Sequence, residues 1–194
     1  VIPYSSEKIK SFNTNRLDFI DSISFMASSL DELIKNMNGE NFTRFNRQFS
    51  SYNEGLRKLI QRKGVYPYSY VKSYEVLKET SLPPIEAFYN DLTKMHITNE
   101  EYFHACAVWS AFECKTMEDY TNLYLKTDVM LLCDVFDKFR EMCMETYGLE
   151  ASNYITAPSL GWDAMVKTTG VIIENIVDYD MHLMIQSGIR GGVS

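Results

Sequence analysis

The feature that most constrains this chain is a long amphipathic run between Thr116 and Gly148. Thr116 is a good helix N-cap and is followed by two acids, whereas Gly148 is typical of a helix C-terminus. Apolar residues recur along the run at helical spacing, at Leu123, Leu131, Leu132, Val135, Phe136, Phe139, Met142 and Cys143. The pattern predicts one long helix with a broad stripe facing the core.

Tyr124 and Asp128 lie near the start of this run. They are four residues apart, so a helix places both side chains on one face. A tyrosine and an acid in that arrangement can reach one metal-bound phosphate together. The same spacing is also expected of a core tyrosine beside a solvated acid, and the pair alone does not decide between the two.

Helix predominates in the rest of the chain as well. Caps, apolar spacing and Gly or Pro stops predict helices at 29–37, 42–49, 53–62, 85–92, 102–112 and 158–170, and a last helix that Asp178 or Asp180 caps and that ends at Gly188. Asn38-Gly39 and Gly64 are expected to end the helices before them, and residues 65–74 to form an extended, packed loop. The alternation in Arg16–Asp21 predicts a strand. No repeat or linker divides the chain, which indicates one domain or a piece of one.

The composition is that of a globular protein, with 45% hydrophobic and 13% aromatic residues. No apolar run approaches the length of about 18 residues that a membrane helix needs, and no leader pattern opens the chain. We therefore expect an intracellular soluble protein without a signal peptide. The cysteines (Cys106, Cys114, Cys133 and Cys143) form no C-x-x-C pair and are expected to be reduced core thiols within helices. The histidines (His96, His104 and His182) lack metal-ligand spacing and are interpreted as structural or surface residues.

The charge is negative overall but uneven. A net charge of −7 argues against nucleic-acid binding over the whole surface. Residues 41–63, however, contain the single acid Glu54 and the basic residues Arg44, Arg47, Arg57, Lys58, Arg62 and Lys63. Such a patch is compatible with binding a single nucleic-acid strand at one place on the surface. A solvated helix face is the alternative interpretation.

Several short motifs occur together and in a fixed order along the chain. They are Phe19-Ile20-Asp21-Ser22 with Ser29-Leu30, Thr80-Ser81-Leu82-Pro83-Pro84, Tyr124-Leu125-Lys126-Thr127-Asp128 with 129–139, Ser159-Leu160-Gly161-Trp162-Asp163-Ala164-Met165, and Gly188-Ile189-Arg190-Gly191-Gly192. As a set they resemble the exonuclease region of protein-primed family B DNA polymerases. The resemblance is greatest to the polymerases of Polinton/Maverick-like transposons and of related viruses or linear plasmids.

This resemblance implies an α/β fold, an incomplete RNase H-like (DnaQ-like) exonuclease domain that is predominantly helical in this segment. Residues 1–187 would be the C-terminal part of that domain, and residues 188–194 the start of the linker to a polymerase domain. The implied function is DNA replication by a DNA-directed DNA polymerase with 3′→5′ proofreading. Tyr-x-x-x-Asp is the third exonuclease motif of that family. Carried over, Asp128 would bind Mg²⁺ or Mn²⁺, and Tyr124 would hydrogen-bond the attacking water or the scissile phosphate.

Further roles follow from the same resemblance. Lys63-Gly64-Val65-Tyr66 is similar to a lysine motif in which Lys63 would steady the phosphate or the nucleophile; a surface lysine is the alternative. Ser22 could contact the frayed 3′ strand, or be a plain turn serine. Arg190, Gly191 and Gly192 resemble the Tyr-x-Gly-Gly linker that binds the template strand, although Ile189 replaces the tyrosine.

Two other motifs of the family are not found in their expected places. No Asp-x-Glu occurs in the chain, and a string that fits the second motif, in residues 175–180, lies after the third motif. We therefore expect an interior segment of a polymerase that by itself neither polymerises nor hydrolyses DNA. The complete protein would bind single-stranded 3′ ends, template DNA, dNTP and terminal protein, and no membrane.

The alternative is a non-enzymatic helical interaction module, or a decayed relic of a transposon or virus. An exposed apolar patch beside residues 16–21 would indicate absent sheet strands, and a patch elsewhere would indicate a partner.

Overall fold

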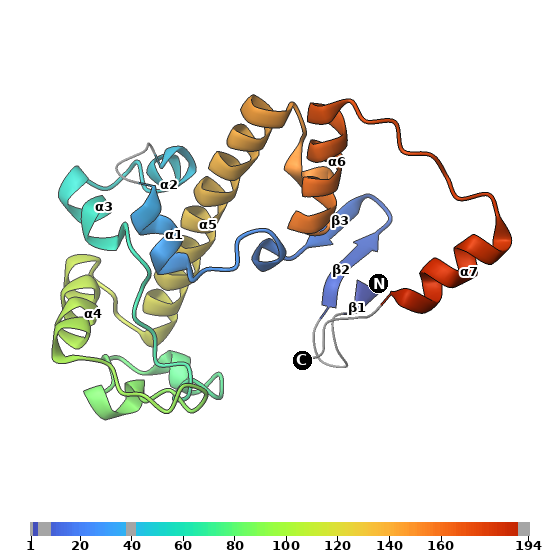
Figure 1. Cartoon of the computed structure of the whole chain (residues 1–194). Helices are drawn as coiled ribbons and strands as arrows, with labels where there is room; N and C mark the ends of the chain where they lie inside the picture. The colour runs from blue at the N-terminus through green and yellow to red at the C-terminus, as the bar shows by residue number, and fades with distance from the viewer. Residues whose placement is uncertain (1, 4–8, 38–41, 190–194) are drawn as a thin grey trace.

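The fold is organised along helix α5 (Met117–Tyr147), the helix predicted from the amphipathic run. The computed structural model describes residues 2–3, 9–37 and 42–189. With 31 residues, α5 is about 46 Å long. Thr116 and Asp119 form a capping box at its start, and Gly148 closes it in the left-handed conformation with φ 64°. Figure 1 shows several of the shorter helices arranged along this helix.

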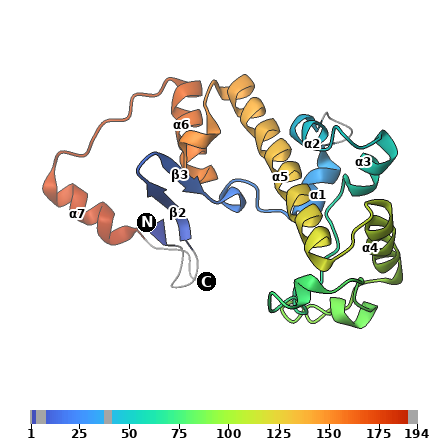
Figure 2. The same cartoon turned by 180° about the vertical axis from the view of Figure 1, so that it is seen from behind.

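Four shorter helices cover the first two thirds of α5 (Figures 1 and 2). They are α1 (Leu30–Asn36), α2 (Thr43–Gln48), α3 (Glu54–Ile60) and α4 (Asn99–Ala111). Capping boxes begin α1 at Ser29 and α4 at Thr98, and Asn53 caps α3. These local signals made the helices readable from the sequence.

Helix α2 is capped by a residue from α5. Phe42 at its N-cap position makes no side-chain hydrogen bond to the helix. Instead Asp134 accepts hydrogen bonds from the backbone N–H groups of Arg44 (2.8 Å) and Phe45 (2.9 Å). Asp134 is only 5% exposed. Its carboxylate therefore satisfies helix donors that would otherwise be buried without a partner.

The stripe of α5 contributes to two hydrophobic clusters. The larger one joins α1–α4 to the first two thirds of α5 through Ile34, Met37, Phe42, Phe45, Phe49, Ile60, Val65, Phe88, Ala105, Val108, Met117, Tyr120, Leu131 and Val135. The smaller one joins Cys143 near the end of α5 to Ala151 and Leu160. Long-range packing along one helix thus holds segments from most of the chain together.

A small antiparallel sheet precedes α1. Its order is β1-β2-β3, from β1 (Ile2–Pro3), β2 (Ile9–Thr14) and β3 (Leu17–Ile20). Phe12 lies opposite Phe19, and their rings stack at 4.4 Å. The predicted strand at Arg16–Asp21 is confirmed as β3, which is an edge strand of the described sheet, whereas β2 was not predicted. The described chain is thus mostly helical with a small sheet, compatible with the expected α/β class.

The C-terminal part contains η4 (Ala151–Asn153), α6 (Ala157–Thr169) and α7 (Tyr179–Gly188). Asp178, and not Asp180, caps α7 by accepting from the N–H of Met181 at 2.8 Å. Helix α7 has no buried residue. Figures 1 and 2 show it separated from α6 by an extended segment, residues 171–178.

Three local predictions were wrong. The helix expected at Ile85–Leu92 is only the short 3₁₀ helix η3 (Ile85–Phe88), because the Asn90 side chain then accepts from two following N–H groups and forms a turn. Helix α3 ends at Ile60, before Gly64. Cys114 lies in the loop between α4 and α5 and not within a helix.

All four cysteines are free thiols. None of the helices in the described part of the chain is both long and apolar enough to cross a lipid bilayer. The expected stop at Asn38-Gly39 lies outside the described residues.

Candidate functional site

The loop that follows α3 crosses the N-terminal part of α5 at Tyr124. Gly64 lies against the tyrosine ring so closely that a Cβ atom on it would be 2.6 Å from Cδ2 and 2.9 Å from Cε2. Tyr66 stacks on the same ring at 4.7 Å with an interplanar angle of 21°. The hydroxyl of Tyr66 is 3.0 Å from Oγ1 of Thr121, one turn earlier on α5. The loop and the helix therefore hold the Tyr124 ring between them.

Tyr124 is buried, but its hydroxyl is linked to an exposed residue. Tyr68 is 55% exposed, and its hydroxyl is hydrogen-bonded to that of Tyr124. The two rings meet edge to face at 6.0 Å. Burial raises the pKa of Tyr124, and the hydrogen bonds with Asp128 and Tyr68 raise it further. Tyr124 is thus a neutral phenol at physiological pH, and acts as a hydrogen-bonding group and not as a base.

Asp128 completes the group on α5. Its Oδ1 atom is buried and has no hydrogen-bond partner among the described residues. Burial raises the pKa of Asp128, while a hydrogen bond from Tyr124, the backbone N–H of Gly64 and the positive charge of Lys63 act in the opposite direction. The structure therefore brings the loop that carries Lys63 to Tyr124 and Asp128. Asp128 is also less solvated than the alternative interpretation assumes.

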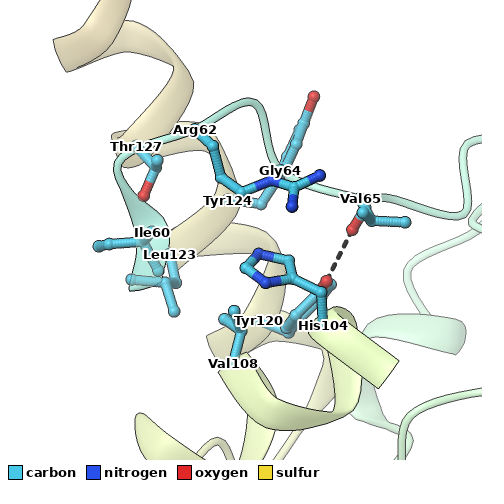
Figure 3. A pocket seen from close by; sticks show the side chains of 10 residues that line it. All are labelled: Ile60, Arg62, Gly64, Val65, His104, Val108, Tyr120, Leu123, Tyr124 and Thr127. Atoms are coloured by element: carbon cyan, nitrogen blue, oxygen red, sulfur yellow. Dashed lines mark hydrogen bonds between the residues drawn. The ribbon is translucent and has the colours of Figure 1, made fainter. Parts of the chain in front are cut away.

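A small pocket lies beside this group (Figure 3). Its volume is about 20 Å³, and it is lined by Ile60, Arg62, Gly64, Val65, His104, Val108, Tyr120, Leu123, Tyr124 and Thr127. Thr127 is 3% exposed, and its Oγ1 has no hydrogen-bond partner among the described residues. The hydroxyl of Tyr120 donates to the carbonyl of Val65 at 2.6 Å, which fixes the loop over the helix. The pocket admits a group no larger than water.

His104 faces the pocket from α4, close to the guanidinium of Arg62 (Figure 3). Partial burial lowers the pKa of His104, and the charge of Arg62 lowers it further. The imidazole is therefore neutral at pH 7. This agrees with its interpretation as a structural residue.

Ser22 is not brought to this site. It begins the 3₁₀ helix η1 (Ser22–Ser24), and its carbonyl accepts from the N–H groups of Phe25 and Met26. Phe25 packs on Phe136 and Phe139 of α5. These rings lie about 12 Å or more beyond Asp128 along the helix axis. The structure thus supports the turn interpretation of Ser22, whereas Arg190, Gly191 and Gly192 lie outside the described residues.

The basic segment of residues 41–63 divides into two groups. Arg44 pairs with Asp137, Lys58 pairs with Glu54 at 2.6 Å, and Arg57 donates to the carbonyl of Tyr52. Arg47, Arg62 and Lys63 have no carboxylate within ion-pair distance in the described part of the chain. Two of these three cations, Arg62 and Lys63, lie at the Tyr124 site.

The fit to a divalent cation is partial. A buried carboxylate oxygen without a partner is a suitable hard ligand for Mg²⁺ or Mn²⁺. Among residues 2–3, 9–37 and 42–189, however, no group of three or more His, Cys, Asp or Glu side chains is arranged to hold a metal ion. Asp128 fits as one ligand, and the described residues do not complete a metal site.

Sequence reasoning missed two features of this site. It did not single out Tyr68, and it gave Gly64 no role beyond ending a helix, whereas it named Arg62 as one member of the basic segment. The aromatic sequence after Gly64 was the available signal, because three tyrosines, one proline and one valine in residues 65–70 are unusual for a solvated loop. Which ring meets which hydroxyl depends on tertiary packing.

The chain was also compared with known proteins. No protein-family model, no curated protein and no solved structure matches it.

Proposed function

We propose that this chain supplies part of a 3′→5′ exonuclease site that binds the single-stranded 3′ end of DNA. The proposed context is the RNase H-like proofreading domain of a protein-primed family B DNA polymerase. The observation that carries the proposal is the packing of Gly64 on the Tyr124 ring, which brings the loop with Lys63 to Tyr124 and Asp128 from a distant part of the sequence. The motif resemblance assigns functions to Lys63, Tyr124 and Asp128.

The chemistry of the three side chains suits a phosphodiester. The ammonium group of Lys63 offsets phosphate charge, and the phenol of Tyr124, which does not titrate, can turn its single O–H from Asp128 to a phosphate oxygen. Asp128 offers one oxygen to a divalent cation. Two-metal hydrolysis requires several carboxylates, so we assign strand binding and one metal ligand to this chain and derive no hydrolytic step from it.

The first test measures the affinity of the 194-residue chain for a fluorescent oligo(dT), by anisotropy over a series of salt concentrations. Each phosphate contact to single-stranded DNA adds about 0.7 to the magnitude of the slope of log K against log salt. We expect Lys63→Ala to reduce the slope by about that amount and to weaken binding roughly tenfold. Lys35→Ala, which removes an exposed cation on α1, is the charge-matched control and should change neither.

Absence of oligo(dT) binding by the wild-type chain, or equal behaviour of the two variants, would overturn the proposal. Nuclease assays with Mg²⁺ and with Mn²⁺ address the second part. We expect no turnover from the isolated chain. Turnover that Asp128→Ala abolishes would show that the chain holds a complete catalytic site, contrary to the role assigned here.

A second candidate function, a helical interaction module, has its own observation. The accessible surface is 14,037 Å², whereas a compact monomer of this mass exposes about 9,500 Å². Exposed apolar side chains occur at the sheet (Phe12, Leu17 and Phe19) and on α7 (Met181, Leu183, Met184 and Ile185). They lie both beside residues 16–21 and elsewhere, so their position favours neither hypothesis. Light scattering of wild type and Met184→Asp tests self-association through α7.

A further inference from the structure

We infer that Arg62 is a second phosphate-binding cation, so that the site takes a strand with at least two neighbouring phosphates and not a free mononucleotide. This inference rests on the proposed strand-binding function and deepens it. It concerns a residue to which the motif resemblance assigns no role.

Arg62 and Lys63 act on different groups beside Tyr124. The charge of Lys63 lowers the pKa of Asp128, one turn after Tyr124 on α5. The charge of Arg62 instead lowers the pKa of His104 on α4. Figure 3 shows the Arg62 side chain between the Tyr124 ring and His104. Two adjacent residues of the loop thus bring positive charge to the Tyr124 site and act on different neighbours of that tyrosine.

Arg62 is exposed to solvent, and its positive charge is not balanced by an ion pair in the described part of the chain. No Asp or Glu in the described part of the chain lies within ion-pair distance, although the protein carries 26 acids against 19 basic residues. Other described cations do form ion pairs, among them Lys35, Arg44, Lys58, Lys78 and Arg140. His104, which lines the same pocket, is neutral at pH 7 and cannot balance a guanidinium. An anion from outside the described chain is the natural partner for this group.

The size of the pocket beside Arg62 limits which part of a ligand can enter it. A volume of about 20 Å³ is far below the roughly 300 Å³ of a small-molecule site, so no base or sugar enters it. The polar lining includes the buried Thr127 Oγ1, which has no partner among the described residues and lines the pocket with Arg62. The pocket therefore holds at most water, which can bridge the hydroxyl to a group above it. The nucleotides must pass over the outer surface, where Arg62, Lys63 and Tyr68 are exposed.

The test uses the full chain and two probes, fluorescent oligo(dT) and dTMP as a mononucleotide competitor. We compare wild type, Arg62→Ala, Arg62→Lys, Lys63→Ala and the control Lys35→Ala over salt from about 50 to 200 mM. Because Arg62 is exposed, its removal should leave the thermal unfolding curve unchanged. We expect Arg62→Ala to lower the salt slope by about 0.7 and to weaken oligo(dT) binding roughly tenfold.

Two further results are expected. Arg62→Lys retains the slope, because the charge is kept. The weak competition by dTMP is the same for Arg62→Ala and wild type, because a single phosphate engages Lys63 alone.

The outcomes separate the two claims. If Lys63→Ala weakens binding but Arg62→Ala behaves as Lys35→Ala does, the inference is overturned and the proposed function stands. If Arg62→Ala weakens dTMP competition as strongly as oligo(dT) binding, both cations bind one phosphate, and the inference is overturned as well. If the wild-type chain binds no oligo(dT), both the inference and the proposed function fail.

Discussion

Gly64 and Tyr124 are in such close contact that a methyl group on the glycine would overlap the tyrosine ring, at 2.6 Å from Cδ2. This contact brings the backbone of the Lys63 segment to α5, where the N–H of Gly64 also acts on Asp128. One residue without a side chain thus joins the loop to both functional groups of the helix.

Replacing Gly64 by alanine should therefore disturb the site directly. We expect a loss of about 1–3 kcal/mol in the free energy of unfolding, because the ring or the loop must move. Oligo(dT) affinity should fall together with stability. Gly161→Ala is the matched control, since nothing lies within 4 Å of that position and it is within α6. Alanine there should stabilise by about 0.5–1 kcal/mol. Urea unfolding of both variants measures the two free energies. Equal changes in stability would contradict a close contact between Gly64 and the Tyr124 ring.

Asp134→Ala should be strongly destabilising. The carboxylate accepts from two backbone N–H groups at the start of α2, and the backbone donors of Arg44 and Phe45 would lose their partners. A loss of about 2–3 kcal/mol in the free energy of unfolding is expected, since buried donors are left unsatisfied. The measurement is chemical denaturation at pH 7. A change within experimental error would show that α2 does not depend on this cap.

Asp128→Asn, in contrast, should raise the free energy of unfolding at pH 7. The pKa of Asp128 is raised in the folded state, so its ionised form opposes folding. Wild-type stability then falls as pH rises from about 3.9, the unfolded value, through the folded pKa, whereas the amide variant lacks this loss. In thermal melts from pH 3 to 7, the unfolding temperature of the variant should rise relative to that of wild type over that pH range. Equal or lower stability of the variant at pH 7 would contradict a desolvated carboxylate.

His104 should give a second pH dependence, in a different window. Its pKa is lowered in the folded state, so the unfolded chain takes up a proton first as pH falls below about 6.5. Wild-type stability should decline from there down to the folded pKa. His104→Gln cannot be protonated, and the difference between the two proteins isolates the effect. Unfolding at pH 8, 6.5 and 5 measures it, and a pH-independent difference would refute the shift.

The sequence predicted the parts of this fold that depend on local chemistry. Capping boxes at Ser29, Thr98 and Thr116 and the glycine at 148 mark helix ends through contacts within a few residues, and those ends were found. The cap of α2 could not be found in this way, because Asp134 lies some 90 residues from the N–H groups that it binds.

The candidate site shows the same division. The positions of Tyr124 and Asp128 on one face follow from helical periodicity. The approach of Lys63 was expected only from the motif resemblance. The hydrogen bond of Tyr68 and the close packing of Gly64 arise from tertiary contacts between the loop and α5, which no local pattern encodes.

The most direct test of the central claim is an NMR titration of the 194-residue chain with oligo(dT), followed through backbone amide shifts. If Lys63, Tyr124 and Asp128 form a strand-binding site, the largest shifts will occur at Lys63–Tyr68 and around Tyr124–Asp128, and Lys63→Ala will reduce them. Shifts centred on the sheet, on α7 or around Arg47, or no shifts at all, would contradict the account.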